Sequence, residues 1–318
     1  MTMRRITRKK NSLNGVTIRK VMYQMKADYQ LYLLILPIVA YFIIFKYFPI
    51  YGLKIAFLDY DPALGFEKSI WVGFDNFMEF FTGPYFELTL KNTLVLSFYS
   101  LLASMPIPIL FALVLNSFRD SKGRKAIQTI TYAPHFISTI VIVGMLQLFL
   151  SPSSGIINRL VVWGGGKAIN FLGEPSMFRH VYVWSGIWQN LGWDSVIYLA
   201  ALSSVNPELH EAAQLDGANR IQRMRYIDLP GILPTIVILL ILHFGSIMSV
   251  GFEKVYLLQN TTNSQTSEII ATYTYKQGIQ RAQYGYSAAV GMFNSVVNLF
   301  LLTVVNKISK KVTEVSLW

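Results

Sequence analysis

The stretch EAAQLDGANRIQRMRYIDLP, residues 211–230, separates two strongly apolar stretches, SVIYLAALSSV (195–205) and PTIVILLIL (234–242). It contains three acidic residues and three arginines, with a glycine at Gly217 and a proline at Pro230. An organised polar segment between two membrane-like stretches indicates a loop with a task of its own at one surface of a membrane.

The composition indicates that lipid is the solvent for much of the chain. Of the 318 residues, 53% are hydrophobic and 14% are charged, whereas a soluble domain carries about 25% charged residues. The chain has no cysteine, which excludes disulfides, thiolate metal sites and cysteine nucleophiles.

Apolar runs of about 18 residues or more are candidate membrane-spanning helices, and the sequence has six of them. We therefore expect an all-α membrane protein with six transmembrane helices. The transmembrane domain is expected at residues 29–306, between a basic N-terminal segment, residues 1–28, and a C-terminal tail, residues 307–318. The six runs cover residues about 30–50, 92–117, 126–150, 181–204, 231–250 and 286–305.

The basic residues predict the orientation. Residues 1–28 hold eight Lys and Arg, residues 119–125 hold four, and the quoted loop and the tail after Asn306 hold three each. These 18 of the 28 basic residues lie on one side of the predicted membrane domain, and basic loops face the cytoplasm. Both termini and the quoted loop are therefore expected in the cytoplasm. The same rule accounts for the net charge of +11 without a nucleic-acid partner.

The sequence has no arrangement of residues that is typical of a catalytic site. The four histidines are not at metal-ligand spacing on one helix face. The segment WGGGKA, residues 163–168, departs from a phosphate-binding loop because the first glycine would fall on Val161 and no Ser or Thr follows Lys167. The sequence predicts no catalytic residue, no metal site and no ATP hydrolysis in this chain.

The polar loop has the signals of a short helix, a turn and a second helical segment. Asn206 is a typical helix N-cap and Pro207 suits the first helical position. Gly217 supplies the positive φ of a sharp turn, and Pro230 can start the next spanning helix. We expect this unit, residues 206–230, to lie on the cytoplasmic face and to fit a groove in a partner; the alternative is an ordinary polar loop.

The spacing of these residues resembles the EAA loop of binding-protein-dependent ABC importer permeases. The similarity continues in WVGFDNF (71–77), NTLVLS (92–97), GFEKVYLLQN (251–260) and YGYSAAVGMFNSVVN (284–298). It is greatest to oligosaccharide permeases of the maltose and glycerol-phosphate type, in particular those for polygalacturonan, alginate and other complex glycans. The loop residues that carry the resemblance are Glu211, Ala212, Ala213, Asp216, Gly217, Ala218, Ile227, Leu229 and Pro230.

The resemblance implies a type I importer permease in a bacterial inner or plasma membrane. Its partners would be a second, homologous permease, two ATPase subunits and an extracytoplasmic solute-binding protein that delivers an oligosaccharide. ATP and magnesium would be bound by the ATPase, with no cofactor in this chain. The EAA residues, with Arg220, would couple this permease to the ATPase, and Glu211 would form a salt bridge to a basic ATPase residue.

The predicted fourth helix, residues 181–204, carries a candidate sugar path. Asn190, Trp193 and Asp194 share one helix face, with Tyr198 one turn further on. An aromatic ring, an amide and a carboxylate suit a sugar, and ionisable groups inside a membrane are usually functional. The same groups could hold helices together, and both interpretations remain open.

Two further features are compatible with a path and with a structural role. Trp188, with Trp184, is either a sugar platform or an anchor at the membrane interface. Asn294 belongs to a small, polar face of the sixth helix, for which helix packing is favoured. The alternatives to an oligosaccharide permease are a permease of the same class for another small solute, or a stand-alone secondary transporter. Such a transporter would need its own coupling-ion site, for which the sequence offers one mid-membrane carboxylate, Asp194.

Overall fold

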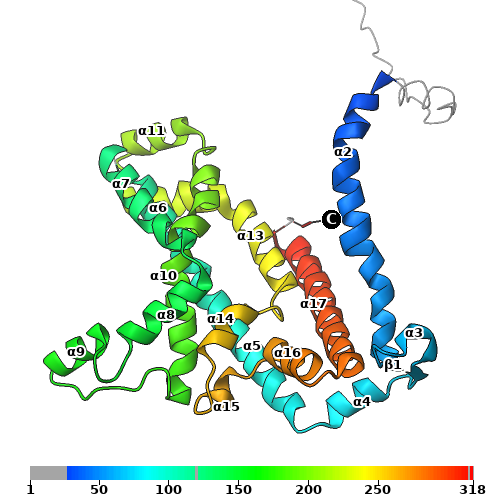
Figure 1. Cartoon of the computed structure of the whole chain (residues 1–318). Helices are drawn as coiled ribbons and strands as arrows, with labels where there is room; N and C mark the ends of the chain where they lie inside the picture. Colours follow the sequence, from blue (N-terminus) through cyan, green and yellow to red (C-terminus); the bar gives the residue numbers. More distant parts are fainter. Residues whose placement is uncertain (1–26, 119–120, 314–315, 318) are drawn as a thin grey trace, which may run out of the picture. The chain divides into compact units, whose positions relative to one another are not determined.

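The computed structural model describes residues 27–118, 121–313 and 316–317, and these residues form two units that meet in the sequence at residues 54 and 55 (Figure 1). The predicted basic segment, residues 1–28, lies almost wholly outside the described residues. The first unit consists of α2 (Tyr29–Phe42), a π-helical turn η1 (Ile43–Tyr47) and the start of the 3₁₀ segment η2 (Phe48–Phe57). Its apolar side chains are largely exposed within the chain, as expected of a helix that faces lipid or a partner subunit.

The second unit is almost entirely helical. Its only strands among the described residues, β1 (Leu58–Asp59) and β2 (Ile70–Trp71), form one short antiparallel pair. The helices before the long central helix are α3 (Gly65–Lys68), α4 (Asp75–Thr82), α5 (Tyr85–Ser104), α6 (Pro106–Asn116), α7 (Ser121–Tyr132), η3 (Ala133–Phe136), α8 (Thr139–Phe149) and α9 (Ile156–Trp163).

The remaining helices begin with the central helix α10 (Pro175–Leu202). They continue with α11 (Pro207–Leu215), α12 (Arg220–Arg223), η4 (Met224–Asp228), α13 (Leu229–Gly245), α14 (Phe252–Leu258), α15 (Ser264–Ser267), α16 (Ile270–Tyr275), η5 (Lys276–Gln280) and α17 (Tyr284–Thr313). Figure 1 shows α11 at the same end of the second unit as α7, and α9 and α15 at the other end.

Helices able to cross a membrane account for most of the predicted spans. Four described helices are long and apolar enough: Tyr29–Phe57, Tyr85–Asn116, Arg220–Gly245 and Tyr284–Thr313. A fifth span is possible if the bent pair Lys122–Phe136 and Thr139–Phe149 crosses as one. The helix α10, which contains predicted span 181–204, is 28 residues long but is not among these four. The count of six therefore remains a prediction.

The predicted span 126–150 consists of two helices with a bend of 100° between them. Pro134 lies in the 3₁₀ turn η3, and Ile137 has an extended backbone that ends it. Ser138 then caps α8, because its hydroxyl accepts a hydrogen bond from the Val141 N–H. A hydropathy pattern does not register this bend, because apolar residues continue on both sides of it.

The helix α10 forms the centre of the second unit and packs against α5, α6, α7, α13, α14 and α15. One buried apolar cluster joins α10 to α5, α8 and α14 through residues such as Leu96, Val183 and Val255. Another joins α10 to α6 and α13 through Tyr198 and Ile232 among others. Three polar side chains of α10, Ser185, Gln189 and Ser195, are buried between helices, whereas Asp194 is exposed.

Candidate functional site

The segment that links α10 to α13 begins with the capped helix α11. The side-chain oxygen of Asn206 accepts a hydrogen bond from the Glu208 N–H at 3.0 Å, which satisfies a backbone donor that the first turn leaves free. Pro207 occupies the first helical position, where its missing N–H has no cost. Local chemistry alone therefore accounts for where α11 starts.

A glycine turn ends α11. Gly217 has a φ of +79°, a left-handed conformation that glycine adopts readily. The Ala218 N–H donates to the Ala213 carbonyl at 2.8 Å, and the Gly217 N–H donates to the Gln214 carbonyl at 3.1 Å. This pair of bonds defines a Schellman motif, so the chain reverses direction at a fixed angle directly after α11.

The segment after the turn is continuous with a spanning helix. Asn219 and Gln222 form a capping box, with hydrogen bonds of 2.9 and 2.7 Å between side chains and backbone. From Arg220 the chain stays helical through η4 into α13, as far as Gly245, and Pro230 lies in the first turn of α13. Any force applied to the turn is thus transmitted directly to a helix of 26 residues.

An ion pair that the sequence reasoning missed ties α11 to this helix. His210 Nε2 lies 3.2 Å from Asp228 Oδ1, and Asp228 is buried. Arg223 lies beside them in the same cavity of about 320 Å³. The two residues were visible in the sequence, because His210 is the one histidine and Asp228 is one of the four acids in residues 206–230. They are 18 positions apart, however, and their contact depends on the turn between them.

The outer face of the segment exposes both charged and apolar groups. Glu211, Ala212, Asp216 and Arg220 are exposed, and Ala213 is half-buried. Leu215 is 90% exposed and Ile221 is 74% exposed. At the far end Ile227 is half-buried while Leu229 and Pro230 are exposed. Large apolar side chains this accessible beside charged ones are typical of a surface that a partner covers.

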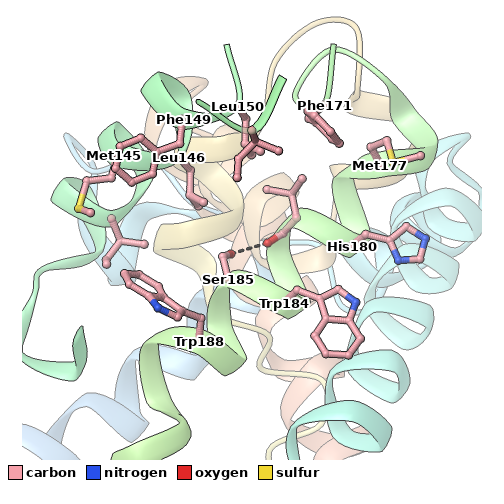
Figure 2. Close-up of a pocket in the computed structure, with 13 residues that line it drawn as sticks. Met145, Leu146, Phe149, Leu150, Phe171, Met177, His180, Trp184, Ser185 and Trp188 are labelled. Atoms are coloured by element: carbon pink, nitrogen blue, oxygen red, sulfur yellow. Dashed lines mark hydrogen bonds between the residues drawn. The ribbon is translucent and has the colours of Figure 1, made fainter. Parts of the chain in front are cut away.

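A second candidate region is an apolar cavity of about 520 Å³ between α8, α9 and the first half of α10 (Figure 2). Trp184 and Trp188 lie at its wall, together with aliphatic and sulfur side chains of α8 such as Met145. The Trp184 indole N–H donates to the Tyr99 hydroxyl at 3.0 Å. With so few polar groups, the cavity suits lipid or another apolar surface better than the hydroxyls of a sugar.

The third region is a polar cavity of about 390 Å³ on the opposite side of the same stretch of α10. Asn190 and Asp194 line it, as the sequence pattern predicted for one helix face. Lys254 and Glu253, from α14, line it as well. Lys254 was not among the predicted path residues, because it lies between the predicted spans 231–250 and 286–305.

The predicted path residues are not all brought together. The side-chain carbonyl of Asn190 lies 2.9 Å from His135 Nδ1, and the Trp193 ring stacks on the His135 ring with centroids 4.5 Å apart. Tyr198 is buried in the cluster with α6 and α13. Asn294 lines a separate cavity near α16 and α17, and its side-chain oxygen has no hydrogen-bond partner within the described residues.

Comparisons with known proteins identify the class. The chain belongs to the family of binding-protein-dependent transport system inner membrane components, whose model matches residues 104–314. The resemblance inferred from the loop is thereby confirmed. The chain is a permease subunit of a sugar or oligosaccharide ABC transporter.

Relatives and solved structures support this assignment. The chain is 47% identical over 284 residues to the polygalacturonan/rhamnogalacturonan transport system permease protein YteP of Bacillus subtilis, covering 89% of this chain and 88% of that one. It is 30% identical to the arabinooligosaccharides transport system permease protein AraP of the same organism, covering 89% and 88%. A chain of a bacterial ABC transporter involved in the import of the acidic polysaccharide alginate superposes with a TM-score of 0.85 at 43% identity, covering 92% and 99%.

Proposed function

We propose that this permease imports oligosaccharides in a complex with a second homologous permease, two ATPase subunits and an extracytoplasmic binding protein. The alginate importer, which is similar to this chain over 93% of its length, has been solved with a periplasmic protein bound to an alginate pentasaccharide. This chain itself lacks the sequence features of an ATPase, so ATP and magnesium are assigned to the partner subunits.

The observation that carries the proposal is the mechanical continuity of the segment 206–230. A capped helix, a glycine turn of fixed angle and an unbroken 26-residue helix form one lever. Closure of the ATPase dimer would push on α11 and tilt α13 as a rigid body. Glu211 and Arg220, both exposed on the lever, would pair with charges of the ATPase, and Leu215 would fill an apolar pocket there.

The orientation follows from the same assignment. The lever faces the cytoplasm, where ATP is available, and this agrees with the distribution of Lys and Arg in the sequence. Both termini are then cytoplasmic, and the loop that follows α8 faces outward. The polar cavity lined by Asn190 and Asp194 is the section of this chain that a hydrophilic cargo would contact.

The experiment that tests the proposal is a Leu215→Asp substitution in the complex reconstituted in nanodiscs. A charge on a side chain that enters an apolar pocket should weaken attachment of the ATPase and abolish hydrolysis stimulated by the loaded binding protein. The matched control is Leu160→Asp, since Leu160 is also exposed on a short helix, 57% in its case, but lies in α9. Normal ATPase attachment and stimulation in the Leu215 variant would contradict the proposed docking surface.

A further inference from the structure

Lys254 is a buried cation at the wall of the polar cavity. It lies in α14, which is outside the candidate membrane spans, and it is 8% exposed. Its ammonium donates to the Tyr182 carbonyl at 3.2 Å and lies 5.3 Å from the centroid of the Tyr182 ring. These two contacts satisfy part of its hydrogen-bonding capacity and stabilise the cation through the ring face, but they supply no negative charge to pair with it.

A half-buried lysine nearby in the sequence, Lys276, is neutralised differently. Lys276 Nζ lies 2.5 Å from Glu268 Oε2 and donates to the side-chain oxygen of Gln259 at 2.7 Å. Within the described residues no carboxylate lies within 4.0 Å of Lys254 Nζ, although Glu253 is next to it in sequence. A buried charge is costly unless it is paired, and burial lowers the pKa of Lys254 to about 8.

The surroundings of this ammonium form a cavity of the right size and polarity for a sugar. The volume of about 390 Å³ lies within the range of small-molecule sites. Thr139, Gln189 and Asn190 add one hydroxyl-bearing and two amide-bearing side chains to its lining. The carboxylates of Asp194 and Glu253 also line it, and they can accept hydrogen bonds from sugar hydroxyls.

The ammonium lies close to a glycine of α10, Gly186. A Cβ at Gly186 would lie 3.5 Å from Lys254 Nζ. A methyl group would therefore fit in contact with the ammonium, and any larger side chain would cover it. Gly186 and Lys254 both line the cavity, so the missing side chain at Gly186 leaves room beside the ammonium.

We propose that Lys254 is the counter-ion for a carboxylate carried by the cargo, so that this permease selects acidic oligosaccharides built from uronate residues. The inference rests on the proposed function, because it concerns the path of the oligosaccharide. An ammonium that has lost its water binds a carboxylate through short, charge-assisted hydrogen bonds. A neutral sugar leaves the same ammonium unpaired. The preference for acidic over neutral oligosaccharides therefore arises both from the bond gained with the acidic sugar and from the unpaired charge left by the neutral one.

The test is a Lys254→Cys variant, followed by chemical restoration of the charge. The chain has no cysteine of its own, so a methanethiosulfonate reagent modifies only the introduced thiol in this subunit. An aminoethyl reagent produces a side chain that is nearly isosteric with lysine and positively charged. A propyl reagent produces a neutral side chain of the same size. Mass spectrometry establishes the extent of modification.

Uptake of a labelled oligogalacturonate into proteoliposomes is the readout, with a neutral oligosaccharide of similar length for comparison. We expect Lys254→Cys to reduce acidic uptake about 10- to 100-fold, in line with the loss of a charge-assisted bond. The aminoethyl adduct should restore it, the propyl adduct should not, and oligogalacturonate should slow modification of the thiol. Lys91→Cys, at an exposed lysine on α5 away from the cavity, is the matched control.

The outcomes separate this inference from the function on which it rests. Equal rescue by the charged and neutral adducts would show that the position needs bulk rather than charge, and would overturn the inference. The inference would also be overturned if the wild-type complex imported the neutral oligosaccharide and not the acidic one. The proposed function, oligosaccharide import, would still hold in that case. A wild-type complex that imports neither sugar would contradict the proposed function itself. Lys254→Met, which needs no reagent, should reproduce the loss of acidic uptake seen for Lys254→Cys, and full acidic uptake by that variant would count against the inference.

Discussion

The ion pair between His210 and Asp228 fastens α11 to the helix that continues as α13, and replacing His210 by alanine should loosen the lever. The two side chains lie 3.2 Å apart, with 25% of the histidine and 6% of the aspartate exposed. Exposed ion pairs contribute less than about 1 kcal/mol, whereas removing one member of a buried pair costs about 3–5 kcal/mol. This pair lies between those cases, so a loss of about 1.5 kcal/mol follows, which is a little over tenfold in an equilibrium constant.

The assay is ATP hydrolysis by the nanodisc complex with and without loaded binding protein. A lever that is detached about ten times more often should transmit less motion, so the stimulated rate should fall while the unstimulated rate stays the same. The ATPase should still co-purify, because the exposed docking face of α11 is unchanged. A fall in both rates together would instead indicate general instability of the complex.

A double-mutant cycle identifies the pair as the cause. His210→Ala and Asp228→Asn should each reduce the stimulated rate, and the two together should do no more harm than the worse single change, because they remove the same interaction. The reasoning is refuted if the two effects add, since each residue would then act through some other contact. Glu208→Ala, at an exposed acid in the first turn of α11, serves as the control and should leave the stimulated rate within about twofold of wild type.

Two further predictions concern the turn and the topology. Gly217→Val should cost about 1–2 kcal/mol of local strain at a φ of +79° and abolish stimulated hydrolysis. Asparagine tolerates this conformation, so Gly217→Asn should retain most of the stimulated hydrolysis. Equal activity of both variants would show that the angle of the turn is irrelevant. In intact cells an impermeant thiol reagent should label Ser153→Cys and leave Lys122→Cys unmodified, and labelling of the latter from outside would reverse the predicted orientation.

The sequence predicted well those features that neighbouring residues determine. The start of α11 follows from Asn206 and Pro207, and its end follows from Gly217, because caps and turns are made by contacts a few residues apart. The membrane class and the family follow from composition and from the EAA spacing. All of these signals are local in the chain or are averages over long windows, so they can be recognised without knowledge of the fold.

The features that escaped prediction depend on contacts between distant segments. His135 was considered only as a possible metal ligand, yet it stacks on Trp193 and contacts Asn190, which is 55 residues away. Lys254 lies between the predicted spans 231–250 and 286–305, and only the packing of α14 on α10 shows that it is buried beside a cavity. A hydropathy pattern records which residues are apolar, and it carries no information about which polar side chains the fold will enclose.

The segment 206–230 and the polar cavity are connected through directly packed helices. The lever continues into α13, and α13 packs directly on α10 and on α17. The helix α10 supplies Asn190 and Asp194 to the polar cavity and also Tyr182, whose carbonyl holds the Lys254 ammonium. A tilt of α13 would therefore displace the wall against which the cargo is held.

Packing alone does not establish energetic coupling. The decisive measurement uses His210→Ala, at a residue that does not line the polar cavity. It asks whether this substitution changes how strongly oligogalacturonate protects a thiol at position 254. A change in the ATP-bound complex alone would show that the lever sets the state of the cavity, and an unchanged protection in every nucleotide state would show that the two regions act independently.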